Sequence, residues 1–453
     1  MSPRRAVRLA VAAGLAAALP AVAAAPASAQ QLLRSWGTLG DAPTQFRDIK
    51  DVVADARGYV YVLDETLGSS GRVQKFTADG RLIRTFGRPN DPDDQRRTEE
   101  LPGAIDSGES LAIGPDGTVY VGEAGPDRAR VSVWSPLGEY RRAFGSRGDG
   151  PGQFRSAAGL AVDGAGNVLV GDSSNQRVVV FTNPGAFAGT IGAGTSLSAV
   201  DEPTLGSTDG LTFGPNGLLY VGDSPQVKLF RPTGEFAGLF GQRADDPGPF
   251  FQDVSDLAFA GPVLYVSDRR LSRVQAFTET GGYLGQLGAG PGSQPGQLTE
   301  PTAVTTDCRG AIYVADAGNR RIQKFGPAGA TPCGDVTNDP QERFLVKLGG
   351  PTVLRFREDF AAVPQVTCDR PCTATVTGTV RISGRRRAVR LEPAREVING
   401  PAPVRVAVAP SEAGTDAIAA ALRRRKRVSA SLRLSVRDLA GKTVVRTRVY
   451  RLR

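Results

Sequence analysis

The chain has 453 residues, which is enough for two or three folding units, and its composition does not suggest a helical protein. Gly (56) and Pro (32) are abundant and there is one Met, so many short strands joined by tight turns are expected. The net charge is +9 and there is no His. The lack of His excludes Ser–His and Cys–His nucleophile pairs and imidazole metal sites.

Residues 1–29 have the pattern of an export signal. Three arginines precede an Ala/Leu/Val run, and small residues at 27–29 offer a cleavage site. The Arg4-Arg5 pair raises twin-arginine export as an alternative, but the residues after it favour the general secretory route. No later apolar run reaches the ~18 residues that a membrane helix needs. We therefore expect a secreted or cell-envelope-associated protein.

Four cysteines lie in the C-terminal third of the sequence: Cys308, Cys333, Cys368 and Cys372. An even number in an exported chain is typical of two disulfides. Three pairings are possible, and proximity favours 308 with 333 and 368 with 372. A metal site is the alternative, although zinc sites usually combine closely spaced cysteine pairs or His.

A repeat of about 50 residues runs through the first two thirds of the chain. An aromatic or aliphatic residue followed by Gly recurs with this spacing, which indicates repeated units that pack side by side. The six marks are Trp36-Gly37, Phe86-Gly87, Phe144-Gly145, Ile191-Gly192, Phe240-Gly241 and Leu287-Gly288.

Each unit contains a valine-rich strand that ends in an acid: Asp64, Glu123, Asp172, Asp223, Asp268 or Asp316. The next strand begins with Arg in five units, so acid and Arg are expected to pair across one hairpin. The fourth unit has Gln226 in place of the Arg and a shortened turn, Ser224-Pro225. For Asp223 we expect a structural role in the turn, with a ligand or cation site as the alternative.

These marks together resemble the NHL repeat, and the third and sixth units match best. The third has Gly152-Gln153-Phe154, Asp172, Asn175, Arg177 and Phe181; the sixth has Gly296-Gln297-Leu298, Asp316, Asn319, Arg321 and Phe325. The resemblance implies an all-β chain with a six-bladed NHL-type β-propeller over residues 30–330. It also implies a binding or scaffold role, since NHL propellers commonly serve in this way.

The ring has a predicted closure. The sixth unit stops after its third strand, while residues 32–37 precede the first unit like an orphan fourth strand. We expect this N-terminal strand to complete the last blade, because a closed ring leaves no long free edge.

A second module follows a Gly/Pro/Asp-rich linker at 331–341. Short alternating runs over residues 342–453 predict about seven strands, which suits a small immunoglobulin-like β-sandwich. One helix is predicted at 411–424, with Ser411 as its cap.

This second module is strongly basic, with 24 Lys and Arg against nine Asp and Glu from residue 342 onward. The densest runs are candidates for salt-dependent binding of an anionic envelope polymer. A compositional bias towards Arg is the alternative, and nucleic acid is an unexpected partner for an exported protein. The candidates are Arg385, Arg386, Arg387, Arg423, Arg424, Arg425, Lys426 and Arg427.

Enzymes of the same fold limit the chemistry that can be expected. The amidating lyases of this type rely on His ligands, which this chain lacks. A calcium-dependent hydrolase or lyase needs convergent carboxylates, and the strand-end acids are the only candidate set. We predict no cofactor and a non-catalytic protein that binds an extracellular protein or glycan. The candidate contact is the long acidic segment 88–109, with Asp91, Asp93, Asp94, Glu99 and Glu100.

Overall fold

The computed structural model describes residues 30–66, 70–87, 103–126, 128–192, 204–241, 251–326, 346–349, 353–354, 365–368, 372–398, 404–406, 408–438 and 443–452. Several predictions fall outside these ranges. They are the signal at 1–29, the linker at 331–341, Cys333, and the acidic residues Asp91, Asp93, Asp94, Glu99 and Glu100.

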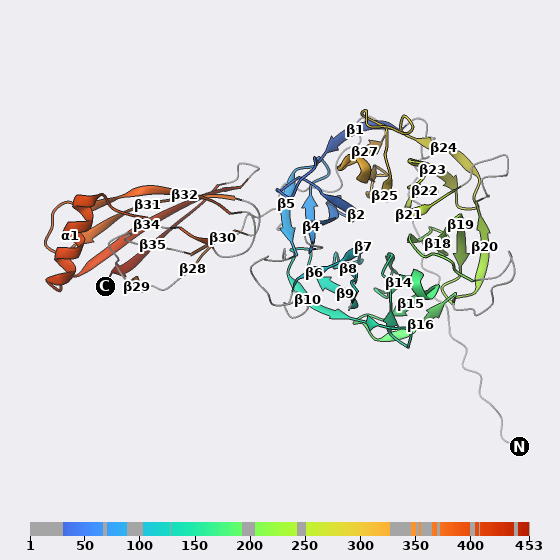
Figure 1. Ribbon diagram of the computed structural model, residues 1–453, viewed down its shortest axis with the longest axis horizontal. Helices are drawn as coiled ribbons and strands as arrows, with labels where there is room; N and C mark the ends of the chain where they lie inside the picture. The colour runs from blue at the N-terminus through green and yellow to red at the C-terminus, as the bar shows by residue number, and fades with distance from the viewer. Residues whose placement is uncertain are drawn as a thin grey trace, which may run out of the picture.

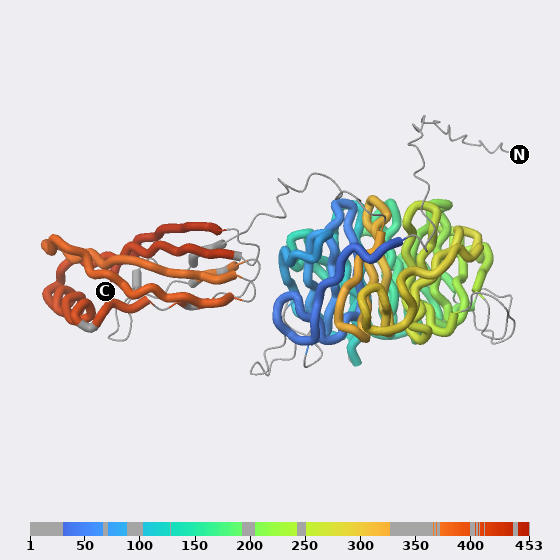
Figure 2. The backbone as a smooth tube through the Cα atoms, turned by 90° about the horizontal axis from the view of Figure 1, so that it is seen from above, coloured from blue at the N-terminus to red at the C-terminus, as the bar shows by residue number. Residues whose placement is uncertain are grey.

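The described residues between 31 and 326 include six antiparallel sheets arranged in a ring (Figure 1 and, turned by 90°, Figure 2). Five sheets have four strands, and a short fifth strand extends the first. In each sheet the first strand lies nearest the centre and the last lies outermost. The first three sheets comprise β2 (Asp48–Ala54), β3 (Val60–Glu65), β4 (Ser70–Phe76) and β5 (Leu82–Phe86); β7 (Gly108–Ile113), β8 (Val119–Ala124), β9 (Ala129–Trp134) and β10 (Tyr140–Phe144); and β13 (Gly159–Val162), β14 (Val168–Asp172), β15 (Arg177–Phe181) and β16 (Phe187–Ile191).

The remaining three sheets follow the same order around the ring. They comprise β17 (Leu211–Phe213), β18 (Leu219–Asp223), β19 (Gln226–Phe230) and β20 (Phe236–Phe240); β21 (Val254–Ala260), β22 (Val263–Asp268), β23 (Arg273–Thr278) and β24 (Tyr283–Leu287); and β25 (Pro301–Thr306), β26 (Ile312–Asp316), β27 (Arg321–Gly326) and β1 (Gln31–Trp36). Short elements join them: β6 (Ile105–Asp106), β11 (Ser146–Arg147), β12 (Gln153–Phe154) and the 3-10 turns Ser173–Asn175 and Ala317–Asn319.

The ring closes as predicted, through the N-terminal strand. Strand β1 pairs antiparallel with β27, and Trp36 lies opposite Ile322. The Trp36 ring packs 5.9 Å from the ring of Phe76 in the first sheet and 6.2 Å from that of Tyr313 in the last. One side chain therefore joins the two ends of the ring.

The repeated aromatic–Gly marks have a steric cause. Gly145 follows the outermost strand of the second sheet with φ +82°, a conformation that favours glycine. A Cβ atom at this position would lie 2.5 Å from Cε1 of Phe154, which is fully buried. The Gly thus lets the chain turn inward while the Phe of the next repeat seals the gap between sheets.

The C-terminal residues form two further sheets and one helix. One sheet has the order β29-β35-β34-β31-β32 and the other β28-β30-β33. The elements are β28 (Val346–Gly349), β29 (Val353–Leu354), β30 (Gln365–Cys368), β31 (Cys372–Ile382), β32 (Val389–Ile398), β33 (Val404–Arg405), α1 (Glu412–Arg423), β34 (Val428–Asp438) and β35 (Thr443–Leu452).

The buried core of this unit draws only on residues 366–452 among the described residues, whereas the buried clusters of the ring draw on residues 32–325. Ile418 and Ala421 of α1 pack into it. The strands predicted from the sequence, at 344–348, 353–356, 374–382, 388–391, 404–408, 428–436 and 443–450, do not include β30. This strand was missed because its four residues, QVTC, are half polar and give no clear alternation. Ser411 precedes the helix, but its side chain makes no capping hydrogen bond.

One of the two predicted disulfides is confirmed. Cys368, the last residue of β30, is bonded to Cys372, the first residue of β31. Cys308 is also disulfide-bonded. Cys333, its predicted partner, lies outside the described residues. Within the described residues no helix has the length and apolarity to span a membrane.

Candidate functional site: the central channel and the strand-end acids

The acids at the strand ends hold the inter-sheet segments of the ring. Asp64 closes β3, and one of its oxygens accepts hydrogen bonds from the backbone N–H groups of Arg47 (2.8 Å) and Asp48 (3.0 Å). Its other oxygen lies 2.8 Å from Nη2 of Arg72. The inter-sheet segment and the hairpin turn therefore meet on one face of the ring.

The same arrangement recurs around the ring. Ion pairs between acid and Arg join Asp64 to Arg72, Glu123 to Arg130, Asp172 to Arg177 and Asp316 to Arg321. Asp268 lies opposite Arg273 in the register and accepts three backbone N–H groups, from Gln252, Asp253 and Leu271. Burial raises the pKa of Asp268 and of Asp64. Each of these acids therefore has a hydrogen-bonding or ion-pair partner within the ring.

Asp223 belongs to the same set, through a partner that the repeat pattern did not predict. Its Oδ1 accepts the N–H groups of Gly206 and Ser207, both at 2.6 Å. Its Oδ2 lies 2.6 Å from Nζ of Lys228. Gln226 is the register partner, but Lys228 lies two residues further on and projects to the same face of β19. A lysine thus takes the place of the repeat's arginine.

The central channel contains a second set of acids. It is a hollow of about 330 Å³ lined by the innermost strands of the ring. Four charged side chains from four sheets line it together with Lys50: Asp51, Glu109, Asp209 and Asp256. The expectation that the strand-end acids are the only convergent carboxylates was wrong.

Local backbone irregularities turn these side chains inward. The register of the first two strands shifts around Lys50, Glu109, Ser255 and Thr302, each of which is the extra residue of a bulge. A bulge re-aims the side chains beside it. Charged residues directly before an otherwise apolar inner strand were the sequence signal for this set.

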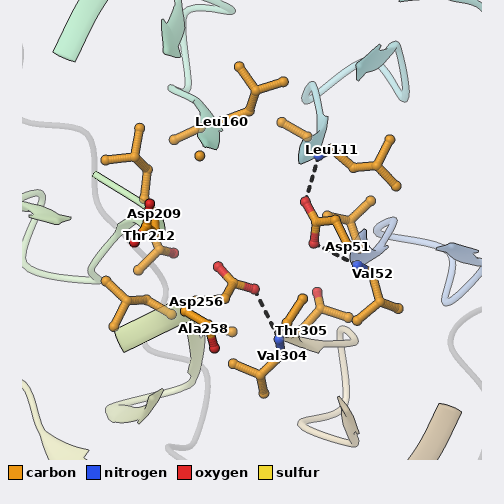
Figure 3. A pocket seen from close by; sticks show the side chains of 18 of the residues that line it. Asp51, Val52, Leu111, Leu160, Asp209, Thr212, Asp256, Ala258, Val304 and Thr305 are labelled. Atoms are coloured by element: carbon orange, nitrogen blue, oxygen red, sulfur yellow. Dashed lines mark hydrogen bonds between the residues drawn. The ribbon is translucent and has the colours of Figure 1, made fainter. Parts of the chain in front are cut away.

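Asp51 and Asp256 occupy equivalent positions in the first and fifth sheets, and Figure 3 shows both carboxylates directed into the channel. Asp51 accepts the N–H groups of Val52 and, from the next sheet, Leu111, both at 2.6 Å. Asp256 accepts the N–H of Val304 from its next sheet at 2.9 Å. Each acid thereby ties one innermost strand to its neighbour.

The channel is an unfavourable place for negative charge. Burial raises the pKa of Asp51 to about 7, against the lowering effect of its two backbone hydrogen bonds. Burial, and then the charge of Asp51, raise the pKa of Asp256 well above its ordinary value. Burial also raises the pKa of Glu109 and Asp209.

Asp106 and Glu109, the last two acids of segment 88–109, lie in strands and not in a solvated loop. Glu109 lies on β7 and accepts the N–H of Ala157 at 2.7 Å. Asp106 lies on β6, which pairs with β4. The backbone N–H of Asp106 donates to Oε2 of Glu123 at 3.1 Å. The C-terminal end of the acidic segment is thus fixed to the face that carries the strand-end acids.

An assembled set of metal ligands is not found among the described residues. No group of three or more His, Cys, Asp or Glu side chains able to hold a metal ion occurs among the residues that the structure describes. The raised pKa values in the channel also disfavour the ionised carboxylates that calcium requires.

The two basic runs of the C-terminal unit come together in space. Arg385 and Arg386 from the first run and Arg427 from the second line one hollow of about 680 Å³. The backbone N–H of Ser383 donates to the carbonyl of Arg427 at 2.9 Å and joins the two turns. Arg387, Arg423, Arg424, Arg425 and Lys426 are exposed but do not line this hollow.

Four-stranded antiparallel sheets arranged in a ring around a channel define a β-propeller. The profile of the NHL repeat matches residues 154–181 and 298–325, which lie in the third and sixth units. The chain therefore contains NHL repeats in a ring with the fold of a β-propeller.

Relatives and solved structures show similarity over about two thirds of the chain. NHL repeat-containing protein 3 of Homo sapiens is 22% identical over 302 residues, covering 65% of this chain and 70% of that protein. A structural genomics protein of unknown function from Bacteroides thetaiotaomicron has a TM-score of 0.49 and 16% identity, covering 66% of this chain and 75% of its own. A streptogramin B lyase structure has a TM-score of 0.43 and 12% identity, covering 67% of this chain and 99% of its own.

Proposed function

We propose that this protein is a non-catalytic extracellular binding or scaffold protein, in which a six-bladed propeller presents one face to a protein or glycan. The observation that supports the proposal is that the acids of the ring already have partners within the protein. Each strand-end acid accepts backbone N–H groups or pairs with a cation, and Asp51, Glu109 and Asp256 accept N–H groups from the next sheet. Carboxylates engaged in this way hold the ring together.

The binding face is the one that carries the inter-sheet segments. The strand-end acids fix the described ends of these segments, as Glu123 does for Asp106. Long connections on a rigid scaffold commonly carry binding function. The acidic residues 91–100 belong to such a connection, so a partner with a basic surface fits this face.

The proposal also includes export of the protein and an immunoglobulin-like fold for the second module. The signal at residues 1–29 would deliver the protein outside the cytoplasm, where the Cys368–Cys372 disulfide persists. The C-terminal unit, with one five-stranded and one three-stranded sheet around a common core, would be an immunoglobulin-like sandwich.

A calcium-dependent hydrolase or lyase is the second candidate, and the channel acids favour it. Two buried carboxylates with raised pKa values in a cleft are a common property of acid–base sites. The hydrogen bonds from Val52, Leu111 and Val304 oppose it, because they take part of the acceptor capacity of these carboxylates and fix their orientation toward the backbone.

The test is affinity capture of partners from intact cells and culture medium with the mature protein. The comparison variant replaces residues 88–102 by a Gly/Ser segment of equal length, which removes the acids and keeps the connection. We expect a specific set of captured proteins or glycans that the variant loses. Identical capture by both proteins would contradict the assignment of this segment, and turnover of a captured ligand would contradict the non-catalytic role.

A further inference from the structure

The outer face of the five-stranded sheet in the C-terminal unit has an unusual composition. One face of β31 and β34 is buried in the core, with Ala374, Val376, Val380, Ala430, Leu432, Leu434 and Val436. The alternate residues point the other way. On these two strands they are only Thr, Ser and Arg: Thr373, Thr375, Thr377, Thr379, Arg381, Ser429, Ser431, Arg433, Ser435 and Arg437.

The register sets arginines beside hydroxyl groups across the sheet. Thr373 lies opposite Arg437 and Thr377 opposite Arg433. At the end of the sheet, Ser429 lies between Arg381 and Arg451. In each of these pairs the guanidinium-bearing and hydroxyl-bearing residues stand about 5 Å apart across neighbouring strands.

Among the residues that the structure describes, these arginines have no acidic partner. None of Arg381, Arg433, Arg437 and Arg451 lies at ion-pair distance from a described Asp or Glu side chain, and all four are exposed. A sheet face built for stability alone would gain from opposite charges across strands. On this face the arginines bring positive charges close together, and their mutual repulsion is relieved when an anion binds.

The face continues into the basic hollow described above. Arg381, Ser429 and Arg451 belong to the face and also line the hollow with Arg385, Arg386 and Arg427. Arg433 and Arg437 are four residues apart on β34, or roughly 13 Å at the rise of an extended strand. The cations therefore form an elongated track with a concave end.

We propose that this track binds a linear polymer of phosphodiester-linked polyol or sugar units. Guanidinium forks match phosphate oxygens in pairs, and neighbouring Thr and Ser hydroxyls supply further hydrogen bonds. The described outward residues of β31 and β34 include no aromatic side chain on which a nucleic acid base could stack. This proposal is independent of the partner of the propeller.

The test compares two matched variants of the full-length mature protein. The track variant carries Arg381→Gln, Arg433→Gln and Arg437→Gln. The control carries Arg423→Gln, Arg424→Gln and Arg425→Gln at the end of α1, the helix whose Ile418 and Ala421 pack against the buried side. Both lose three charges from the same unit. Circular dichroism and thermal melting verify that both are folded.

Binding of synthetic poly(glycerol phosphate) is measured at several salt concentrations, with oligo(dT) and polyglutamate of equal charge as competitors. We expect the track variant to lose at least about tenfold in affinity and its salt slope to fall by about 2 to 3, while the control changes less than about threefold. Equal losses in both variants, or no binding by the unmodified protein, would overturn the proposal. So would stronger binding of oligo(dT), which would indicate nucleic acid, or of polyglutamate, which would indicate charge alone.

Discussion

The carboxylate of Asp51 in the first sheet and that of Asp256 in the fifth point into the same central channel, each held by a backbone N–H of the following sheet. The charge of Asp51 raises the pKa of Asp256. The pair therefore connects the cohesion of the ring to pH.

Replacing Asp51 with Asn is expected to reduce the pH dependence of stability. Between about 4, the ordinary value of an aspartate, and about 7, the raised pKa of Asp51, the folded protein holds a proton that the unfolded chain has released. The free energy of unfolding therefore falls as pH rises through this window, by roughly 1.4 kcal/mol per unit of raised pKa at most.

Urea unfolding at pH 5 and pH 8 measures this effect. We expect the difference in unfolding free energy between the two pH values to be smaller in Asp51→Asn than in the unmodified protein. The exposed Asp149→Asn serves as the control and should keep the full difference. Equal differences in all three proteins would contradict the role of Asp51.

Asp316→Ala is expected to destabilise the protein by about 3 to 5 kcal/mol, because it leaves a mostly buried guanidinium without its counter-charge. Asp316 accepts the N–H of Thr299 at 2.7 Å and pairs with Nε of Arg321 at 2.6 Å. Chemical denaturation gives the loss. A loss below about 1 kcal/mol would mean that the strand-end acids do not hold the segments between sheets.

Asp223 and Lys228 should show strong coupling in a double-mutant cycle. Their 2.6 Å contact is largely buried, with side-chain exposures of 6% and 10%. We expect a coupling energy of at least about 1.5 kcal/mol from Asp223→Ala, Lys228→Ala and the double variant in urea unfolding. Additive losses would show that Lys228 does not substitute for the arginine of the other repeats.

Removal of residues 30–37 should open the ring. The deletion takes away β1, leaves the edge of β27 unpaired and removes Trp36 from its contacts with Phe76 and Tyr313. Unpaired edges promote association. Size-exclusion chromatography should show oligomers or aggregates, and the melting temperature should fall. A monomer of unchanged stability would contradict closure by β1.

The sequence was sufficient to predict the parts of the fold that repeat. The Phe–Gly marks and the acids at strand ends recur because each sheet meets the same steric and hydrogen-bonding demands, as at Gly145 and Asp64. The closing strand could be predicted because the sixth unit has only three strands of its own in the sequence. Strand β30 was missed because four residues carry too little periodicity.

The channel could not be predicted in the same way, since its acids do not repeat. The position of Asp51 holds Ser110, Gly159, Gly210, Asp256 and Ala303 in the other sheets. Only the ring brings Asp51 and Asp256 to one opening, and only the bulges turn Lys50 and Glu109 inward. The repeat did not indicate the lysine partner of Asp223, because Lys228 stands two residues after the Arg position.

If the propeller's carboxylates maintain the ring and leave binding as its function, none of them should hold calcium tightly. Calorimetric titration of the mature, chelator-treated protein with Ca²⁺ at pH 8 measures this, because Asp51 is then ionised. We predict no saturable heat at micromolar to low millimolar Ca²⁺. A tight, stoichiometric site that is lost in Asp51→Asn, Asp256→Asn or Asp223→Ala would contradict the claim and favour the calcium-dependent enzyme.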